Sequence, residues 1–119
     1  MNYYLAIDIG ASSGRHIVSW LENGKIETRE VYRFPNGGEM KNGHLCWDID
    51  GLEKHVVAGL KAAKEQGYTP AYIGIDTWGV DFGLFDKNGK LLGNPYHYRD
   101  TRTNGMEELA DKTIGKEYI

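Results

Sequence analysis

The sequence predicts an α/β fold in which a mixed β-sheet packs against helices. Three observations support this prediction. The first third of the chain contains three extended, apolar-rich segments in succession, an amphipathic helical segment follows them, and a fourth extended segment comes after the helix. The 119 residues are enough for one small domain with a core, and we assign residues 1–119 to a single domain.

The first three segments predict consecutive antiparallel strands. Residues 3–8 are a short apolar run that ends at an acidic residue, so we expect a central strand that is buried on both faces. Residues 15–21 and 26–34 have extended character. The Asn23-Gly24 pair between these two segments is a strong short-range signal for a β-hairpin.

The middle of the chain predicts a turn-rich connector over residues 35–43 and then a helix. Asp50 is the expected N-terminal cap, and Glu53 three residues later makes a capping-box pattern. Gly67 is the expected left-handed stop. Apolar residues recur at helical spacing between these ends, namely Leu52, Val56, Leu60 and Ala63.

The remaining segments complete the predicted layout. Residues 71–76 resemble a second buried strand that ends at an acid, and residues 80–92 resemble a hairpin with its turn at 87–89. Residues 96–100 are expected to be a loop, and a last helix is expected to begin near residue 104 with Met106, Leu109 and Ala110 on its apolar side. Three antiparallel strands, a helix and a further strand give a ribonuclease-H-like layout, with helices packed on a mixed sheet.

Composition and charge exclude several classes of protein. The 17 acidic residues outnumber the 14 basic residues and leave a formal net charge of −3, which argues against a nucleic-acid-binding protein. Mean hydropathy is −0.54, and no apolar run approaches the ~20 residues that a transmembrane helix needs, so we expect no membrane span. The N-terminus lacks a signal-peptide pattern, and the single cysteine excludes an internal disulfide. We therefore expect a cytoplasmic chain.

The first candidate site is the loop that follows the first strand, made of Asp8, Gly10, Ala11, Ser12, Ser13, Gly14 and Arg15. Its small residues allow backbone N–H groups to approach an anion, the serines add hydroxyl donors, and Arg15 adds a bidentate cation. Asp8 could hold a water bound to Mg²⁺ beside phosphates. A hairpin turn without a ligand explains the loop equally well. The loop is not a Walker A motif, because the Gly-Lys-Ser/Thr ending is missing.

The second candidate site is the end of the fourth strand, where Asp76, Trp78, Gly79 and Asp81 lie close together in sequence. Proteins commonly hold sugars with carboxylates that accept hydrogen bonds from hydroxyls and with an aromatic face. The alternative is a strand-to-hairpin corner in which Trp78 is a core residue and Asp81 forms a turn. Both interpretations carry similar weight on spacing alone.

The third candidate is the polar segment at residues 98–105, for which we favour a capped helix entrance with Asp100 paired to an arginine over a recognition loop. Other reactive residue types show no functional pattern. The four histidines lack metal-ligand spacing. Cys46 is expected to be a small buried hydrophobe, and Trp20 and Trp47 are expected to be core residues.

Four segments in order resemble the rhamnulokinases, a branch of the FGGY family of carbohydrate kinases. They read D-I-G-A-S-S-G-R, W-D-I-D, G-I-D-T-W-G-V-D-F and Y-R-D-T-R-T-N-G. Other branches usually carry Gly-Thr-(Thr/Ser)-Ser at the position of residues 10–13 and have different segments at the position of residues 77–81. The resemblance covers essentially the whole chain.

The resemblance implies an actin-like, ribonuclease-H-type ATPase fold and ATP-dependent phosphorylation of L-rhamnulose at O1, in L-rhamnose breakdown. Residues 11–15 would face the β- and γ-phosphates of ATP, and Asp8 would help to position Mg²⁺ through water. Gly79 would lie at the sugar, with Trp78 and Asp81 as neighbours.

The resemblance also implies that this chain is an N-terminal fragment of a two-domain enzyme of several hundred residues. The general-base aspartate and the adenosine site would lie beyond Ile119, so no catalytic residue is expected within the chain. We therefore expect the isolated polypeptide to be inactive. A sheet cut before its later strands exposes an edge, so we also expect self-association.

Three alternatives remain open at this stage. The first is a kinase for another ketose, such as L-fuculose or L-xylulose. The second is a ribonuclease-H-type nuclease with Asp8 and Asp76 as metal ligands, although the negative charge and the apolar inner face of the helix weigh against it. The third is a non-enzymatic module that binds phosphate.

Overall fold

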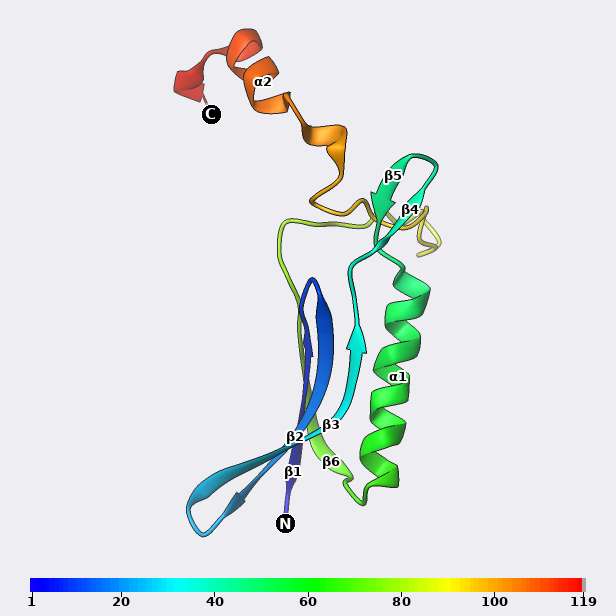
Figure 1. Cartoon of the computed structure of the whole chain (residues 1–119), viewed down its shortest axis with the longest axis vertical. Helices are drawn as coiled ribbons and strands as arrows, with labels where there is room; N and C mark the ends of the chain where they lie inside the picture. The colour runs from blue at the N-terminus through cyan, green and yellow to red at the C-terminus, as the bar shows by residue number, and fades with distance from the viewer. Residues whose placement is uncertain (119) are drawn as a thin grey trace.

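The computed structural model describes residues 1–118 and contains the expected three strands, helix, further strand and last helix, with an additional two-stranded hairpin before the first helix (Figure 1). Its elements are β1 (Tyr3–Ile9), β2 (Ser13–Glu22), β3 (Lys25–Pro35), β4 (Glu39–Lys41), β5 (His44–Cys46), α1 (Ile49–Glu65), β6 (Pro70–Asp76), the 3-10 turn η1 (Thr101–Thr103), α2 (Met106–Ile114) and the 3-10 turn η2 (Lys116–Tyr118). No helix in this part of the chain is both long and apolar enough to cross a membrane.

The main sheet has the strand order β3-β2-β1-β6. The first three strands are antiparallel, and β6 joins the edge of β1 in parallel. The predicted hairpin between β2 and β3 is confirmed. Asn23 has φ 51° and Gly24 has φ 78°, and a two-residue hairpin turn with positive φ at both central residues matches the twist of its strands.

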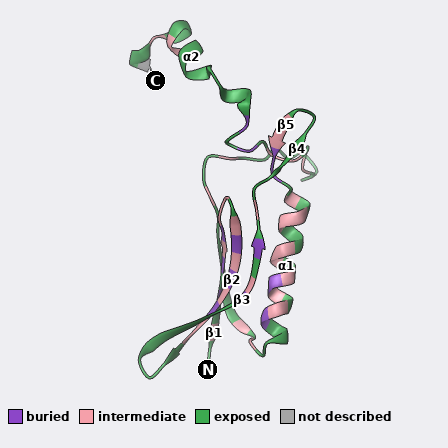
Figure 2. Ribbon diagram, in the orientation of Figure 1, coloured by how far each residue is buried: buried purple, intermediate pink, exposed green. Residues whose placement is uncertain are grey.

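Helix α1 covers one face of the sheet and forms the core with it (Figures 1 and 2). Alternate residues of β1 point to this face, and β2, β3 and α1 supply the rest of the buried cluster. Its buried members are Leu5, Ile7, Ile9, Val18, Val31, Phe34 and Ala63. Leu52, Val56 and Leu60 pack against the cluster, as the helical spacing predicted.

The prediction that β1 is buried on both faces is wrong. Tyr4 and Ala6 are exposed, whereas Leu5 and Ile7 are buried, because α1 packs on one side of the sheet. Residues 71–76 were predicted to form a buried strand. They do lie in a strand, but all six residues are exposed, so the predicted burial is wrong. Strand β6 has β1 as its neighbour on one side, and α1 lies against β2 and β3, so the apolar side chains of β6 remain exposed.

The ends of α1 show one correction and one confirmation. The N-cap is Asp48, whose Oδ1 accepts a hydrogen bond from the Gly51 backbone N–H at 3.1 Å, and Asp50 lies inside the first turn. The cap expected at Asp50 is therefore wrong, because the helix begins at an earlier residue. The stop at Gly67 is confirmed: its φ is +92°, and the N–H groups of Gly67 and Tyr68 bond back to Lys64 and Ala63 in a Schellman pattern.

The second half of the chain has less regular structure than the first. The connector expected over residues 35–43 contains strand β4, which pairs with β5 around an Asn42-Gly43 turn. The hairpin expected over residues 80–92 is reduced to its turn and one isolated bridge between Phe85 and Leu91. The last helix is confirmed as α2, which extends away from the sheet with Met106 and Leu109 about half exposed (Figure 1).

Candidate functional site

The first candidate loop connects β1 to β2 at one end of the sheet. The Gly10 backbone N–H donates to the Ser13 carbonyl oxygen at 2.9 Å, which closes a tight turn over Ala11 and Ser12. Ser12 is exposed at the tip of this turn, while Gly14 is buried. The loop therefore presents its serine hydroxyls and backbone at the carboxyl end of β1, where open α/β sheets commonly bind ligands.

Asn36 fixes this loop from the end of β3. Its side-chain Nδ2 donates to the Gly10 carbonyl oxygen at 2.9 Å, and its backbone N–H donates to the Ser12 carbonyl oxygen at 3.0 Å. Asn36 falls in the turn-rich connector expected from the sequence, which did not indicate this contact. A count along the strands from the Asn23-Gly24 turn places Asn36 near the loop, but a register shift between His16 and Ile17 sets the observed alignment, and the sequence gives no sign of that shift.

Glycine is needed at position 14 because of packing. A Cβ atom at this residue would collide with the Phe34 ring on the neighbouring strand. At Gly10 a Cβ atom would lie 3.0 Å from the Ser13 carbonyl oxygen, which is also tight. Gly14 is therefore explained by packing against Phe34, whatever binds the loop, and Gly10 is a tight position.

Asp8 and Arg15 face each other across β1 and β2. They are register partners, and the Arg15 Nε lies 3.7 Å from the Asp8 Oδ2. Arg15 Nη2 also donates to the Ser13 hydroxyl at 3.4 Å. The guanidinium thus lies between the carboxylate and the loop, and both side chains stay partly exposed.

Asp8 is also the register partner of Asp76 in the parallel pair β1–β6. The two carboxylates therefore stand at the same end of adjacent strands, and carboxylate oxygens are ligands that Mg²⁺ accepts, often through water. Among residues 1–118 no cluster of three or more His, Cys, Asp or Glu side chains forms a closed metal cage. This donor set fits a cation that keeps most of its water and takes the rest of its ligands from a phosphate.

The second candidate segment begins at this same edge and is organised by Asp81. The Asp81 Oδ2 accepts two indole hydrogen bonds, from Trp47 Nε1 at 2.6 Å and from Trp78 Nε1 at 2.8 Å. The two indole rings lie 3.9 Å apart between centroids. Trp47 also stacks on His97 with ring centroids 4.0 Å apart, so three segments of the chain meet around one carboxylate.

The backbone between Trp78 and Asp81 is open and strained. A Cβ atom at Gly79 would meet no atom within 4 Å, so the space beside Gly79 is free. Val80 has φ +67°, a left-handed conformation that β-branched residues rarely adopt, and its side chain is exposed. Strain of this kind concentrates at ligand-binding sites.

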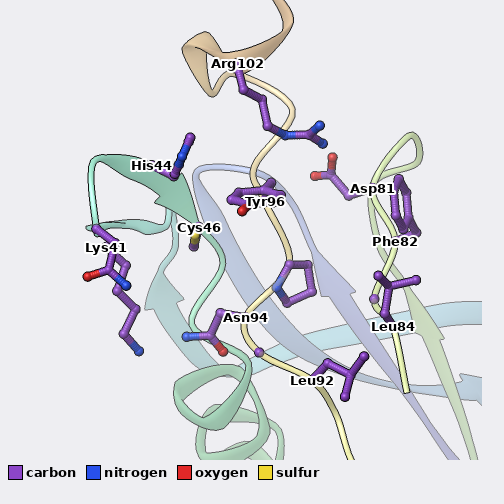
Figure 3. Close-up of a pocket in the computed structure, with 14 residues that line it drawn as sticks. Lys41, His44, Cys46, Asp81, Phe82, Leu84, Leu92, Asn94, Tyr96 and Arg102 are labelled. Carbon is purple, nitrogen blue, oxygen red and sulfur yellow. The ribbon is translucent and has the colours of Figure 1, made fainter. Parts of the chain in front are cut away.

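Asp81 also lines a cleft of about 590 Å³ between the β4–β5 hairpin and residues 82–96 (Figure 3). Apolar side chains contribute much of the wall, and Figure 3 shows Arg102 and Asp81 directed toward the same end of the cleft. The Arg102 guanidinium lies over the Tyr96 ring at 4.6 Å. The cleft lining includes Lys41, His44, Cys46, Phe82, Leu84, Leu92, Asn94 and Pro95.

The third candidate segment is a structural junction. Asp100 caps the 3-10 turn η1 by accepting from the Arg102 backbone N–H. The capped entrance expected for the last helix is not seen there, because α2 begins after Gly105 without a side-chain cap. The expected arginine side-chain partner is wrong: the buried carboxylate instead accepts from the Leu45 N–H at 2.8 Å and contacts His44 Nδ1 at 2.9 Å. The Leu45 N–H and the His44 hydrogen bond lower the pKa of Asp100 below its usual value.

Two buried histidines have lowered pKa values. Burial lowers the pKa of His97, whose Nδ1 accepts from the Arg99 backbone N–H at 2.9 Å. Burial also lowers the pKa of His16, whose Nε2 lies 3.1 Å from the Val56 carbonyl oxygen. Because a carbonyl can only accept, His16 carries a proton on Nε2, and burial favours the neutral form of the ring. Both rings therefore serve as packing groups, His16 against α1 and His97 against Trp47.

Comparison with protein families shows which family the chain belongs to. The model of the N-terminal domain of the FGGY family of carbohydrate kinases matches residues 3–119. The chain belongs to the FGGY family of carbohydrate kinases. FGGY relatives named rhamnulokinase include one from Ligilactobacillus salivarius, 50% identical over 100% of this chain, and one from Bacillus subtilis, 44% identical over 98%. The chain spans 24% of the length of each.

Solved FGGY kinase structures confirm the predicted fold class. The ligand-bound xylulose kinase from Lactobacillus acidophilus matches 99% of this chain and 24% of its own, with a TM-score of 0.74 and 16% identity. The gluconate kinase from the same organism matches 98% of this chain and 24% of its own, with a TM-score of 0.73 and 16% identity. The mixed α/β sheet expected from the order of elements, and the actin-like fold that the family resemblance implied, are thus the fold of this FGGY chain.

Proposed function

We propose that this chain forms the phosphate loop and part of the sugar pocket of a kinase that transfers the γ-phosphate of ATP to O1 of L-rhamnulose. The observation that carries the proposal is the pairing of Asp8 with Asp76 in adjacent parallel strands. It brings the anion-binding loop and the Trp78–Asp81 segment to one edge of the sheet. A phosphoryl donor and its acceptor need this proximity.

In the proposed reaction, the residues of this chain position the phosphates of ATP and neutralise part of their charge. The loop from Ala11 to Arg15 binds the β- and γ-phosphates through backbone N–H groups, the serine hydroxyls and the Arg15 guanidinium. Asp8 would hold a Mg²⁺ ion through water, and a bound Mg²⁺ would supply positive charge beside the phosphates. The O1 hydroxyl attacks the γ-phosphorus, the bond to ADP breaks, and a base outside this chain takes the proton.

Gly79, Trp78 and Asp81 form one wall of the sugar site in this proposal. The free space beside Gly79 admits a ligand carbon or hydroxyl. The Trp78 ring offers an apolar face, and the Asp81 carboxylate accepts a hydrogen bond from a sugar hydroxyl. L-Rhamnulose is the proposed ketose because relatives named rhamnulokinase are 44–50% identical over nearly the whole chain.

The nuclease alternative receives less support. One carboxylate oxygen of Asp8 is engaged by Arg15, and residues 1–118 contain no cluster of three metal-ligating side chains. A two-metal nuclease needs several carboxylates around its cations. A kinase needs only enough oxygen ligands to hold a hydrated Mg²⁺ against ATP.

A chimera tests the proposal. This chain replaces the matching first quarter of the Ligilactobacillus salivarius relative, which is 50% identical to it. ATP-dependent phosphorylation is then measured with L-rhamnulose, L-fuculose and L-xylulose, and the unmodified relative is the control. We expect L-rhamnulose to have the highest kcat/KM. A folded chimera that prefers another ketose, or phosphorylates none, would contradict the proposal.

A further inference from the structure

Trp47 lies where a core residue is expected, yet its polar atom has a specific partner. The side chain is 1% exposed, and the indole Nε1 donates to Asp81 Oδ2 at 2.6 Å. Trp47 directly precedes the N-cap of α1, whereas Asp81 follows β6, so the bond joins the base of the helix to the candidate sugar segment. An indole N–H usually finds a partner when it is buried, but a carbonyl would serve equally well.

The orientation of the Asp81 carboxylate is fixed by two donors that approach the same oxygen. Trp47 and Trp78 both bond to Oδ2, and their rings are in contact. With Oδ2 held by two N–H groups, the carboxylate cannot rotate without breaking both bonds. Oδ1 is thereby held in one direction, at a residue that lines the 590 Å³ cleft (Figure 3).

Trp47 itself is held from its other side. Its ring stacks on His97 with centroids 4.0 Å apart and an angle of 20°, and His97 is 4% exposed. The His97 Nδ1 is occupied by the Arg99 backbone N–H, so the imidazole is also fixed. The chain of contacts from His97 through Trp47 to Asp81 is therefore rigid, and a prealigned acceptor reduces the entropic cost of binding a hydroxyl.

We propose that Trp47 is a positioning residue for the sugar site, which fixes the Asp81 carboxylate so that Oδ1 accepts a hydrogen bond from a ketose hydroxyl. This inference rests on the proposed function, because it assumes that Asp81 faces the sugar. In this proposal the buried Trp47 contributes to substrate affinity through its indole N–H group. Trp47 touches neither ATP nor the reacting atoms in this proposal.

The test removes the N–H and keeps the ring. In the chimera described above, Trp47 is replaced by 3-benzothienylalanine, an isostere in which sulfur takes the place of the indole N–H, and separately by phenylalanine. Trp20 receives the same two replacements as a matched control, since its indole bonds to the surface residue Glu22. Thermal unfolding of every variant is measured beside the kinetics.

We expect the isostere at position 47 to raise KM for L-rhamnulose about tenfold, the size of one hydrogen bond to a charged group, with kcat and the KM for ATP unchanged within about twofold. Asp81→Asn should raise the same KM. The two changes together should raise it no further than Asp81→Asn alone, because they act through one contact.

Two results would overturn the inference. If the isostere at position 47 leaves the ketose KM unchanged while Asp81→Asn raises it, Asp81 binds sugar without help from Trp47. If the two changes multiply, Trp47 acts independently of Asp81. Failure of the proposed function is distinct from both, since the chimera with the unaltered chain would then show no preference for L-rhamnulose.

Discussion

The His16 imidazole lies directly against Gly59 of α1, so a methyl group at position 59 would collide with the ring. This contact sets how closely the helix approaches β2. Histidine is an unusual residue at such a place, yet His16 is fully buried and its Nε2 bonds to the Val56 carbonyl oxygen one turn away on the same helix. The pair therefore fixes both the spacing and the rotation of α1 on the sheet.

Gly59→Ala should destabilise the chain by about 1–3 kcal/mol, the usual cost of overpacking a tight core site. The better helix propensity of alanine, about 1 kcal/mol, offsets part of this cost. Urea denaturation followed by circular dichroism measures the difference. Gly74→Ala is the control, because a Cβ atom there meets no atom within 4 Å. Equal stability of the two variants would show that α1 can shift away from His16.

Stability should fall as pH decreases from about 7.5 to 5.5, by linkage to histidine protonation. Burial lowers the pKa values of His16 and His97 below 6.5 in the folded chain. As pH falls through this range, the unfolded chain therefore binds more protons than the folded chain. The stabilisation is present above pH 6.5 and is lost as pH falls toward the lowered values. Urea midpoints at several pH values test this, and a flat profile would contradict the neutral state of both rings.

Asn36→Ala should loosen the loop between β1 and β2. It removes the donor to the Gly10 carbonyl oxygen, which typically costs about 0.5–1.5 kcal/mol. If the loop binds phosphates as proposed, the chimera carrying Asn36→Ala should also bind MgATP several-fold more weakly by calorimetry. Asn88→Ala in the exposed turn at residues 87–89 is the control. Unchanged ATP affinity would separate Asn36 from the nucleotide site.

Gly79→Ala should impair sugar binding without harming the fold. The added methyl group meets no atom of the chain within 4 Å, and the backbone at Gly79 does not need positive φ, so the melting temperature should change little. The methyl group would instead occupy the space proposed for the ketose and raise its KM in the chimera. A normal KM with a normal melting temperature would place the sugar elsewhere.

The isolated chain should self-associate through β6. Tyr72, Ile73 and Ile75 are 65%, 53% and 59% exposed on a strand with one open edge, and such edges pair readily with other chains. Ile73→Lys should reduce the association, because a charge on an edge strand opposes pairing. Light scattering over a range of concentrations measures the mass. A monomer at every concentration would contradict the prediction.

Local signals predicted the first half of the fold well. The Asn23-Gly24 turn, the helical spacing from Leu52 to Ala63 and the stop at Gly67 each depend on a few neighbouring residues, and all are present in the structure. Burial was harder to predict. Apolar composition made residues 71–76 resemble a buried strand, but burial depends on what packs against a strand, and α1 lies elsewhere.

The candidate site was only partly visible in the sequence. Asp8 and Asp81 were identified because carboxylates beside glycines are a local pattern. Asn36 and Trp47 were missed as contributors, because their partners are 26 and 34 residues away in the chain. A hydrogen bond over such a separation follows from strand register and helix placement, and spacing alone does not indicate it.

The length of the β2–β3 turn affects which residues lie opposite each other at the far end of the sheet. The turn at Asn23-Gly24 and the loop at Gly10 to Ser12 are separated by the whole ten-residue length of β2. Yet the turn, together with the register shift between His16 and Ile17, decides which residue arrives opposite the loop, and that residue is Asn36, directly after β3. A single residue inserted into the turn would shift this alignment and leave the loop without its anchor. This exposed hairpin tip should therefore tolerate changes of side chain far more readily than changes of length.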